Sequence, residues 1–241
     1  MNVAVLSGDA ASDYTAAIAQ RLVEQGDRVS AIVVVRVPRV RRARLLAARV
    51  GVDGLRRELI GRARGGGGEG AGSAPVDAPP VDPVFVDGIN GPDALRVLRA
   101  AAPDVVVYTG GGIVRDELLS IPTVGVLNAH MGLLPGYRGM NALEWSLLYG
   151  DPLGITIHFI DSGIDTGEIL LRREIQPDPT DTVKSLRAAA TRESADALAE
   201  AVRRLREGSE ERTPQTGDGK QYFVMHARLK AVAEARLQRG T

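Results

Sequence analysis

The sequence predicts an α/β protein in which helices flank a mostly parallel sheet and an antiparallel hairpin follows in the second half. Two observations support this fold class. The chain opens with a strand, a helix and a second strand, the unit that places two strands in parallel through a crossover helix. Later, apolar strands at 155–160 and 168–175 are joined by the loop 161–167, and so short a link favours antiparallel pairing.

Along the chain, apolar runs alternate with segments of helical spacing. The run at 2–7 has the pattern of a buried strand, and the run at 29–35 is rich in β-branched residues. Between them, apolar residues recur at helical spacing until Gly26 ends the helix. The same reasoning predicts further strands at 84–86, 105–108, 124–127 and 221–224, and helices at 13–25, 91–102, 141–149 and 181–207. Such an arrangement is Rossmann-like.

Two stretches interrupt this pattern. Residues 36–64 carry many arginines, which suits either a solvated helix face or an anion-binding arm, and the solvated face is favoured. Residues 65–83 are rich in Gly, Pro and Ala and have little to bury, so they predict a flexible loop. We therefore expect one domain over 1–207 that includes this loop. Residues 208–241 form a short extension, too small to be an independent domain.

The composition argues against several classes of function. Lysine plus arginine and aspartate plus glutamate both number 30, which gives no electrostatic reason to expect nucleic acid or an anionic membrane as partner. The chain has no cysteine and three histidines, so we expect no disulfide, no thiolate chemistry and no metal site. The first apolar run is too short for a signal peptide or a membrane span, which predicts a cytoplasmic protein. Nothing in the sequence indicates an oligomeric state.

Polar side chains suited to chemistry lie at the end of one strand and in the hairpin loop. Asn128 and His130 are two residues apart near the end of a predicted strand, so their side chains face the same side. Open α/β sheets bind ligands at the carboxyl ends of their strands. The hairpin loop adds Asp161 and Asp165. If its tip folds over the strand end, an amide, an imidazole and a carboxylate converge.

An amide, an imidazole and a carboxylate together suit acyl transfer to an amine. Attack of the amine develops negative charge on the carbonyl oxygen and positive charge on nitrogen. Asn128 and His130 can stabilise the oxyanion, while a carboxylate of the loop, Asp161 or Asp165, can orient the imidazole and accept protons from the amine. No side-chain nucleophile is needed, in keeping with the lack of cysteine and of a Gly-x-Ser-x-Gly motif. Each residue alone would equally suit a strand-end cap, a buried structural histidine or an Asx turn.

Three motifs follow one another in this region: Asn-x-His at 128–130, Leu-Leu-Pro at 133–135 with Arg138-Gly139, and Asp-x-x-x-Asp-x-Gly at 161–167. In this order they resemble the formyltransferase family, which includes glycinamide ribonucleotide, methionyl-tRNA and sugar N-formyltransferases. The resemblance is close over 105–175 and thinner over 1–30. It implies that Asn128, His130 and Asp165 are catalytic and that 10-formyltetrahydrofolate is the co-substrate. It also implies that Asp161 is a turn-forming residue rather than a second catalyst.

The resemblance further implies where the folate binds. Its pterin ring is expected to pack against the backbone of two segments, which explains why neither needs distinctive side chains. The implied binding residues are Gly111, Gly112, Ile113 and Val114 after the 105–108 strand, and Ile160, Asp161 and Gly163 in the hairpin loop. Tyr137 and Arg138, in the loop after Leu-Leu-Pro, are predicted either to contact the acceptor or simply to anchor that loop.

The identity of the acceptor is the open question. Transfer to tRNA is disfavoured by the neutral charge and by the short extension, since the tRNA enzymes carry a sizeable basic C-terminal domain. Glycinamide ribonucleotide is an alternative, although the turn at 7–12 has one glycine and places Asp9 where a phosphate would sit. We therefore expect transfer to a small amine such as an amino sugar or a specialised metabolite. A 10-formyltetrahydrofolate hydrolase and a non-catalytic folate-binding protein are further alternatives.

Overall fold

The computed structural model describes residues 1–8, 13–36, 79–178, 180–217 and 219–239. The predicted helical stretch at 36–64, apart from Arg36, and most of the predicted loop at 65–83 therefore lie outside the described residues. None of the described helices is long and apolar enough to cross a membrane.

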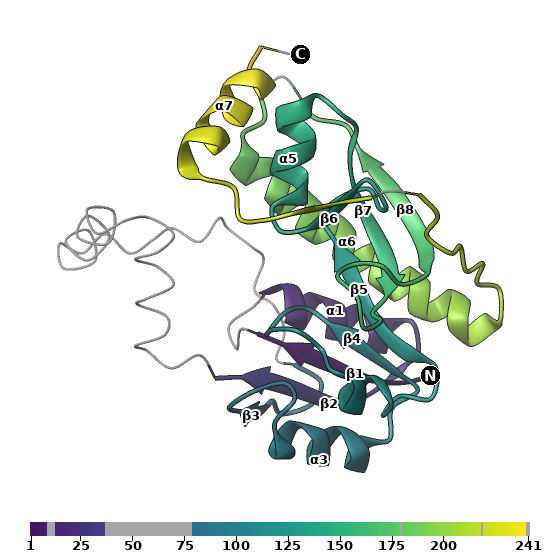
Figure 1. The fold of residues 1–241 in the computed structure, drawn as a ribbon. Helices are drawn as coiled ribbons and strands as arrows, with labels where there is room; N and C mark the ends of the chain where they lie inside the picture. The colour runs from purple at the N-terminus through teal and green to yellow at the C-terminus, as the bar shows by residue number, and fades with distance from the viewer. Residues whose placement is uncertain (9–12, 37–78, 179, 218, 240–241) are drawn as a thin grey trace.

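Among the described residues, one sheet of seven strands forms the centre of the molecule, in the order β3-β2-β1-β4-β5-β7-β8 (Figure 1). Neighbouring strands from β3 to β5 are parallel, whereas β7 is antiparallel to both β5 and β8. The strands are β1 (Asn2–Ser7), β2 (Arg28–Val35), β3 (Val84–Val86), β4 (Val105–Tyr108), β5 (Gly125–His130), β7 (Leu153–Phe159) and β8 (Ile169–Ile175). The predicted parallel sheet with its antiparallel hairpin is confirmed.

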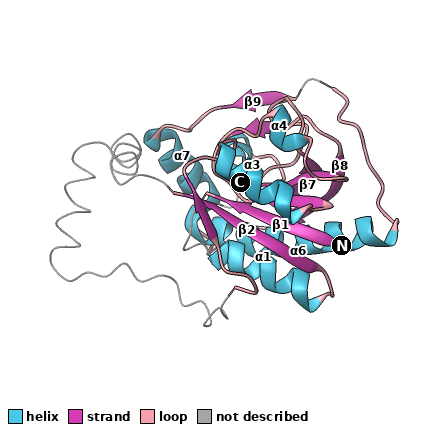
Figure 2. Cartoon of the chain, turned by 90° about the horizontal axis from the view of Figure 1, so that it is seen from below, coloured by secondary structure: helices cyan, strands magenta, loops and turns pink. Residues whose placement is uncertain are grey.

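Helices cover both faces of this sheet and create two cores (Figure 2). On one face α1 (Asp13–Glu24), α5 (Ala142–Tyr149) and α6 (Val183–Glu207) bury Ile18, Leu143 and Leu198. On the other face α3 (Pro92–Ala101) and the short α4 (Asp116–Leu119) bury Leu98 and Leu118. Because both faces are covered, β1 and β4 are almost continuously apolar, as strands inside a parallel sheet must be.

The last part of the chain returns to the body of the protein. After α6 it runs back past β8 and crosses in front of β6 (Tyr137–Gly139), as Figure 1 shows. There β9 (Lys220–Tyr222) pairs with β6 in parallel, and α7 (Ala227–Leu237) then packs against α5. Ala233 and Leu237 bury their side chains in the same core as α5 and α6. The closing segment thus shares its apolar contacts with the main sheet.

One predicted boundary is wrong in a way that matters for the site. The strand predicted at 124–127 is β5, which continues through Asn128 to His130. The strand is longer because Leu127 to His130 pair residue by residue with the neighbouring strand β7. The sequence pattern missed it because two polar residues interrupt the apolar run. Asn128 and His130 are therefore held on a rigid strand rather than in the loop after it.

Candidate active site

Asn128 and His130 lie on the last residues of β5, with the hairpin β7–β8 beside them. In the antiparallel pairing, Asn128 is opposite His158 and His130 is opposite Thr156. His130 is only 6% exposed, whereas Asn128 is partly open to solvent. The hairpin loop brings Asp165 to the same place, so the structure unites the amide, the imidazole and the carboxylate.

The Asp165 carboxylate is the centre of this group. One oxygen, Oδ2, accepts a hydrogen bond of 2.7 Å from the backbone N–H of Gly139 and lies 3.4 Å from Nδ1 of His130. The other oxygen, Oδ1, lies 3.6 Å from Nε2 of His158. Burial raises the pKa of the carboxyl, but the proton-bearing forms of His158 and His130, together with the Gly139 N–H, lower it by more. The pKa of Asp165 is therefore lower than that of an ordinary aspartate.

His130 is held with its reactive nitrogen facing that carboxylate. Its Nε2 lies 2.6 Å from the carbonyl oxygen of Tyr137, and because a carbonyl only accepts, Nε2 carries the proton and donates it. In the neutral ring, Nδ1 is then left unprotonated, facing Asp165. Burial lowers the pKa of His130, and this outweighs the charge of Asp165 and the Tyr137 carbonyl, which both raise it. At neutral pH the pair is thus an ionised carboxylate beside a neutral imidazole that has a free lone pair.

His158 also belongs to the site, although it lies in the middle of an apolar strand, where a histidine is usually structural. Its Nδ1 donates to the carbonyl oxygen of Phe159 at 2.7 Å, so Nε2 accepts a hydrogen bond of 3.1 Å from the side-chain amide of Asn128. That bond fixes which way the Asn128 carboxamide is turned. The pairing of β5 with β7 places His158 opposite Asn128, and no local pattern in the sequence indicates that pairing.

A pocket of about 200 Å³ opens beside this group. Six of the seven predicted folate-binding residues line it, namely Gly112, Ile113, Val114, Ile160, Asp161 and Gly163, together with Asn128, His158 and Asp165. Gly111 is not among the described lining residues. It lies behind the turn, where an added Cβ would come within 2.8 Å of Ile89 and 3.6 Å of Gly8. Its absent side chain thus allows the turn to pack against the sheet.

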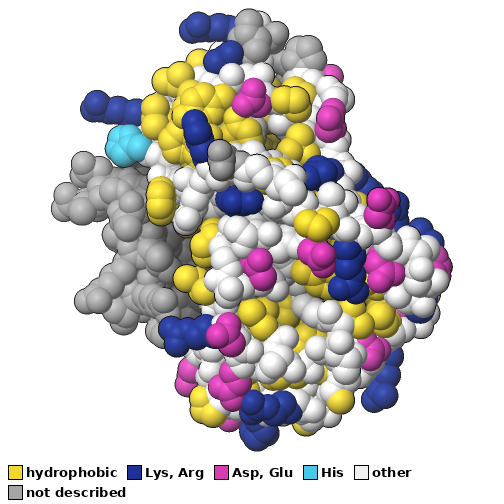
Figure 3. Space-filling view, turned by 45° about the vertical axis from the view of Figure 1, so that its right-hand side comes forward, with side chains coloured by type: hydrophobic (Ala, Val, Ile, Leu, Met, Phe, Trp, Pro, Cys, Tyr) yellow, Lys and Arg dark blue, Asp and Glu magenta, His cyan; other side chains and the backbone are white. Residues whose placement is uncertain are grey.

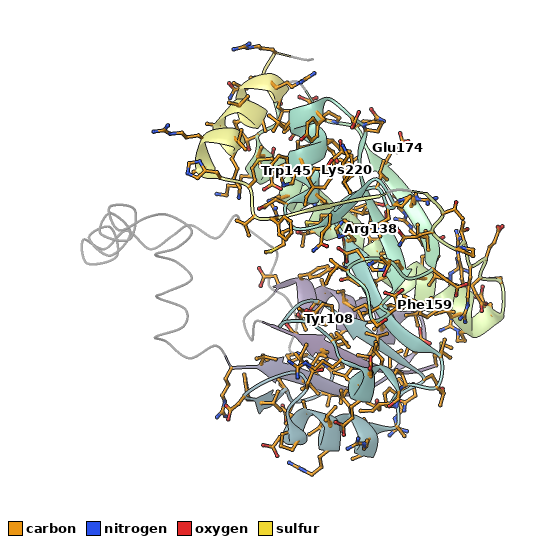
Figure 4. The ribbon with its side chains drawn as sticks, viewed as in Figure 1. Tyr108, Arg138, Trp145, Phe159, Glu174 and Lys220 are labelled. Carbon is orange, nitrogen blue, oxygen red and sulfur yellow. The ribbon has the colours of Figure 1, made fainter. Side chains whose placement is uncertain are left out.

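Tyr108 shapes the glycine turn that forms one wall of the pocket. Its hydroxyl donates to the carbonyl oxygen of Gly112 and accepts from the N–H of the same residue at 3.0 Å. The side chain of Asn90 also ties down the turn, donating to the carbonyl oxygen of Ile113 at 2.8 Å. Burial raises the pKa of Tyr108, so its hydroxyl stays protonated and keeps both roles. Figure 4 shows Tyr108 below the hairpin that forms the opposite wall.

Asp161 and Asp165 have different roles within one loop. Asp161 is exposed, and its Oδ1 accepts from the Gly163 N–H at 3.0 Å and from the Thr166 hydroxyl at 2.6 Å. These are the hydrogen bonds of a residue that shapes a turn, as the sequence predicts. Asp165 instead turns inward, with a backbone φ of +52°, in the left-handed region that few residues other than glycine adopt.

Comparison with known proteins fits this geometry. The family model described as formyl transferase matches residues 1–202. The chain belongs to this family.

Individual relatives within the formyl transferase family differ in acceptor. A methionyl-tRNA formyltransferase from Caldanaerobacter subterraneus is 36% identical over 121 residues, which are 49% of this chain and 39% of that enzyme. The chain thus matches about two fifths of that enzyme's length. The structure of a glycinamide ribonucleotide transformylase from Symbiobacterium toebii superposes with a TM-score of 0.62 at 24% identity, covering 90% of this chain and 95% of that one. The formyltransferase PseJ from Anoxybacillus kamchatkensis, solved with a formamido UDP-sugar and tetrahydrofolate, gives 0.54 at 18%, covering 91% and 85%. These two structures establish the shared fold.

The two residues predicted at the acceptor side have their side chains engaged elsewhere. Tyr137 is 8% exposed, stacks on Tyr222 with ring centroids 5.1 Å apart, and donates its hydroxyl to Asp151. The Arg138 guanidinium donates to the side-chain oxygen of Gln215 at 3.0 Å. Neither residue lines the described pocket. Of the two predicted roles, loop anchoring agrees with these contacts.

Proposed function

We propose that this chain transfers the formyl group of 10-formyltetrahydrofolate to the primary amine of a small acceptor, an amino sugar or a specialised metabolite. The observation that supports the proposal is the position of the Asp165–His130 pair. Asp165 lines a pocket walled by the glycine turn and the hairpin loop, and the neutral imidazole of His130 lies 3.4 Å from its ionised carboxylate. Family membership indicates formyl transfer, and the Asp165–His130 pair supplies the proton acceptor that transfer to an amine requires.

The pocket suits one end of a folate. Its walls combine the apolar side chains of Ile113, Val114 and Ile160 with the exposed backbone of Gly112 and Gly163. Apolar walls next to glycines, which have no side chain to block a close approach, can hold a flat heterocycle. The related structure of PseJ was solved with tetrahydrofolate, which agrees with this choice of co-substrate.

The reaction needs a proton acceptor and an oxyanion donor. The amine lone pair attacks the formyl carbon, a carbon–nitrogen bond forms, and the carbonyl electrons move onto oxygen. The amine then loses a proton, which His130 Nδ1 accepts because that nitrogen has a free lone pair in the resting site. The resulting imidazolium is stabilised by Asp165 and can return the proton to the departing carrier nitrogen. The products are a formamide and tetrahydrofolate, with all protons accounted for.

Asn128 is placed to stabilise the developing oxyanion. One N–H of its amide is used by His158 at 3.1 Å, and the amide also borders the pocket. A side-chain donor that is already oriented before the reaction stabilises charge without reorganising in the transition state. No covalent enzyme intermediate is required in this scheme.

The surface charge favours a small acceptor over a polyanion. Formal charges sum to zero over the chain. On the face shown in Figure 3, described Lys and Arg side chains are interspersed with Asp and Glu rather than gathered in one stripe. Nucleic-acid-binding surfaces instead concentrate positive charge on one face.

The test is release of tetrahydrofolate, followed by absorbance, with and without a panel of amines. The panel contains amino sugars, glycinamide ribonucleotide and methionyl-tRNA as separate arms. We expect release that depends on an amino sugar or another small amine. Equal release without any amine would identify a hydrolase, and release only with glycinamide ribonucleotide or with methionyl-tRNA would replace the proposed acceptor. Folate binding without release in every arm would identify a binding protein.

A further inference from the structure

Gln215 contacts both loops that meet at the catalytic carboxylate. Its side-chain N–H groups donate to the carbonyl oxygens of Asp165 at 2.9 Å and Gly167 at 2.8 Å. Its side-chain oxygen accepts from Arg138, at 3.3 Å from Nε and 3.0 Å from Nη2. One residue therefore bridges the hairpin loop to β6, whose last residue, Gly139, donates to the Asp165 carboxylate.

The chemistry of these contacts allows a single orientation of the Gln215 amide. Both of its donors face carbonyl oxygens, and its acceptor faces a guanidinium that can only donate. Rotating the amide by half a turn would place oxygen against two carbonyl oxygens and N–H groups against a cation. Every hydrogen-bonding group of the side chain is used, so Gln215 is matched to this position by its donors and not only by its size.

Asp165 is a residue that benefits from such support. Its backbone φ of +52° is unfavourable for a side chain with a Cβ, so the loop has to be held in this conformation by its surroundings. The carboxylate accepts from the Gly139 N–H on one side, where the two imidazoles also lie. Gln215 holds the same residue from the backbone side. Loss of either set of contacts would leave the other to hold the loop alone.

Residues 209–217, which we call the tail segment, are built to lie against the hairpin. Thr213 exchanges two backbone hydrogen bonds of 2.9 Å with Ile169 at the start of β8. The guanidinium of Arg212 lies 4.5 Å from the ring centroid of Phe159, the residue that ends β7. Figure 4 shows Phe159 and Arg138 on the side of the molecule that this segment covers. The tail segment lies outside residues 1–202, the part matched by the family model.

We propose that Gln215 is a positioning residue for catalysis and that the tail segment completes the active site by fixing Asp165 against His130. The proposal rests on the proposed function, because it assigns Gln215 a role in the step that Asp165 and His130 perform. It also changes the interpretation of Arg138, whose guanidinium orients Gln215 rather than a substrate. Residues 209–217 thus take part in the chemistry of a site whose catalytic groups all come from earlier in the chain.

The test compares Gln215→Ala and Gln215→Glu with Gln20→Ala, a half-buried glutamine of α1 whose side-chain N–H donates to Glu24 on the same helix. Gln215→Glu keeps the size and the contact with Arg138 but has no N–H donors at neutral pH. Two quantities are measured. Steady-state kinetics give kcat and the KM values, and NMR hydrogen exchange gives the protection of the Gly139 amide, which reports the position of the Asp165 carboxylate without any substrate.

In both Gln215 variants we expect kcat to fall about ten- to hundredfold, because two hydrogen bonds that hold a reacting group are lost. We expect KM for the folate to change less than about threefold and exchange of the Gly139 amide to quicken about tenfold. Gln20→Ala keeps wild-type values. Thermal unfolding identifies a variant that fails to fold, in which case the other Gln215 variant decides.

Unchanged kcat and unchanged Gly139 protection would overturn the proposal, as would a fall in kcat with Gly139 still fully protected. A change confined to KM would place the tail segment in binding instead and would also overturn it. If the Gly139 amide loses protection in the Gln215 variants but the wild-type protein formylates no amine, the positioning of Asp165 stands and the proposed function fails. The two failures are therefore distinguishable.

Discussion

Replacing Asp165 by asparagine removes one charge while keeping the shape of the side chain. In the proposed chemistry, His130 becomes an imidazolium 3.4 Å from the carboxylate. Two unit charges at this separation attract by about 5 kcal/mol at an effective dielectric constant of about 20. The Asp165 side chain is 17% exposed, so solvent screens part of this energy. We therefore expect kcat to fall by about 10²- to 10⁴-fold, which is the range for removal of a group that supports proton transfer.

The assay is steady-state formyl transfer at saturating folate and amine, together with tetrahydrofolate binding and thermal unfolding. Asp161→Asn is the matched control, since it makes the same change in the same loop at a carboxylate that bonds only to Gly163 and Thr166 among the described contacts. We expect that control to keep its kcat, even if KM for the folate changes. A kcat for Asp165→Asn within about threefold of wild type, in a folded protein that binds folate, would refute the reasoning.

Three further predictions concern pH, the glycine turn and a buried ion pair. Because the pKa of His130 is lowered, we expect the acid limb of kcat to lie below the ordinary histidine value of about 6.5; an acid limb above that value would contradict the assignment. Gly111→Ala should weaken folate binding, measured by titration, more than Gly110→Ala does. Both glycines have a positive φ, but only a Cβ added at Gly111 would come within 3 Å of another residue. Arg187→Leu should lower the free energy of unfolding in urea by about 2–4 kcal/mol at pH 7, because it strips a bidentate partner from Glu144, which is 1% exposed. Burial raises the pKa of Glu144, but Arg187 lowers it by more, so the ion pair stabilises the folded protein at any pH above the pKa that Glu144 has in the unfolded chain. The stability lost in Arg187→Leu should therefore shrink as the pH falls through the lower pKa that Glu144 has in the folded protein.

The order of elements was predictable because local patterns decide it. Buried strands such as β1 and β4 are apolar on both faces, and the short loop 161–167 leaves antiparallel pairing as the simplest geometry. The convergence of Asn128, His130 and Asp165 was predictable for a related reason, since Asn128 and His130 share one strand and the hairpin loop lies beside the end of that strand. These are contacts between segments that the sequence already places next to each other.

The parts that were not predictable depend on contacts between distant residues. His158 sits in an apolar strand like any core residue, and only its pairing with Asn128 reveals its place in the site. Gln215 follows a proline in a polar stretch with no motif, 50 residues from Asp165, and its role appears only when the tail segment folds back. Tyr137 and Arg138 lie in the predicted loop, but their side chains turn toward Tyr222 and Gln215. The positions of Tyr137 and Arg138 in the sequence do not determine which way their side chains point.

The most direct test of the proposed formyl transfer is to follow the formyl carbon itself. Wild-type protein is incubated with 10-formyltetrahydrofolate labelled with ¹³C in the formyl group and with an amino sugar, and the products are analysed by NMR and mass spectrometry. We expect a ¹³C-labelled formamide on the acceptor nitrogen, formed with an equal amount of tetrahydrofolate and lost in Asp165→Asn. Labelled formate in place of the formamide, at the same rate with and without the amine, would contradict the proposed transfer.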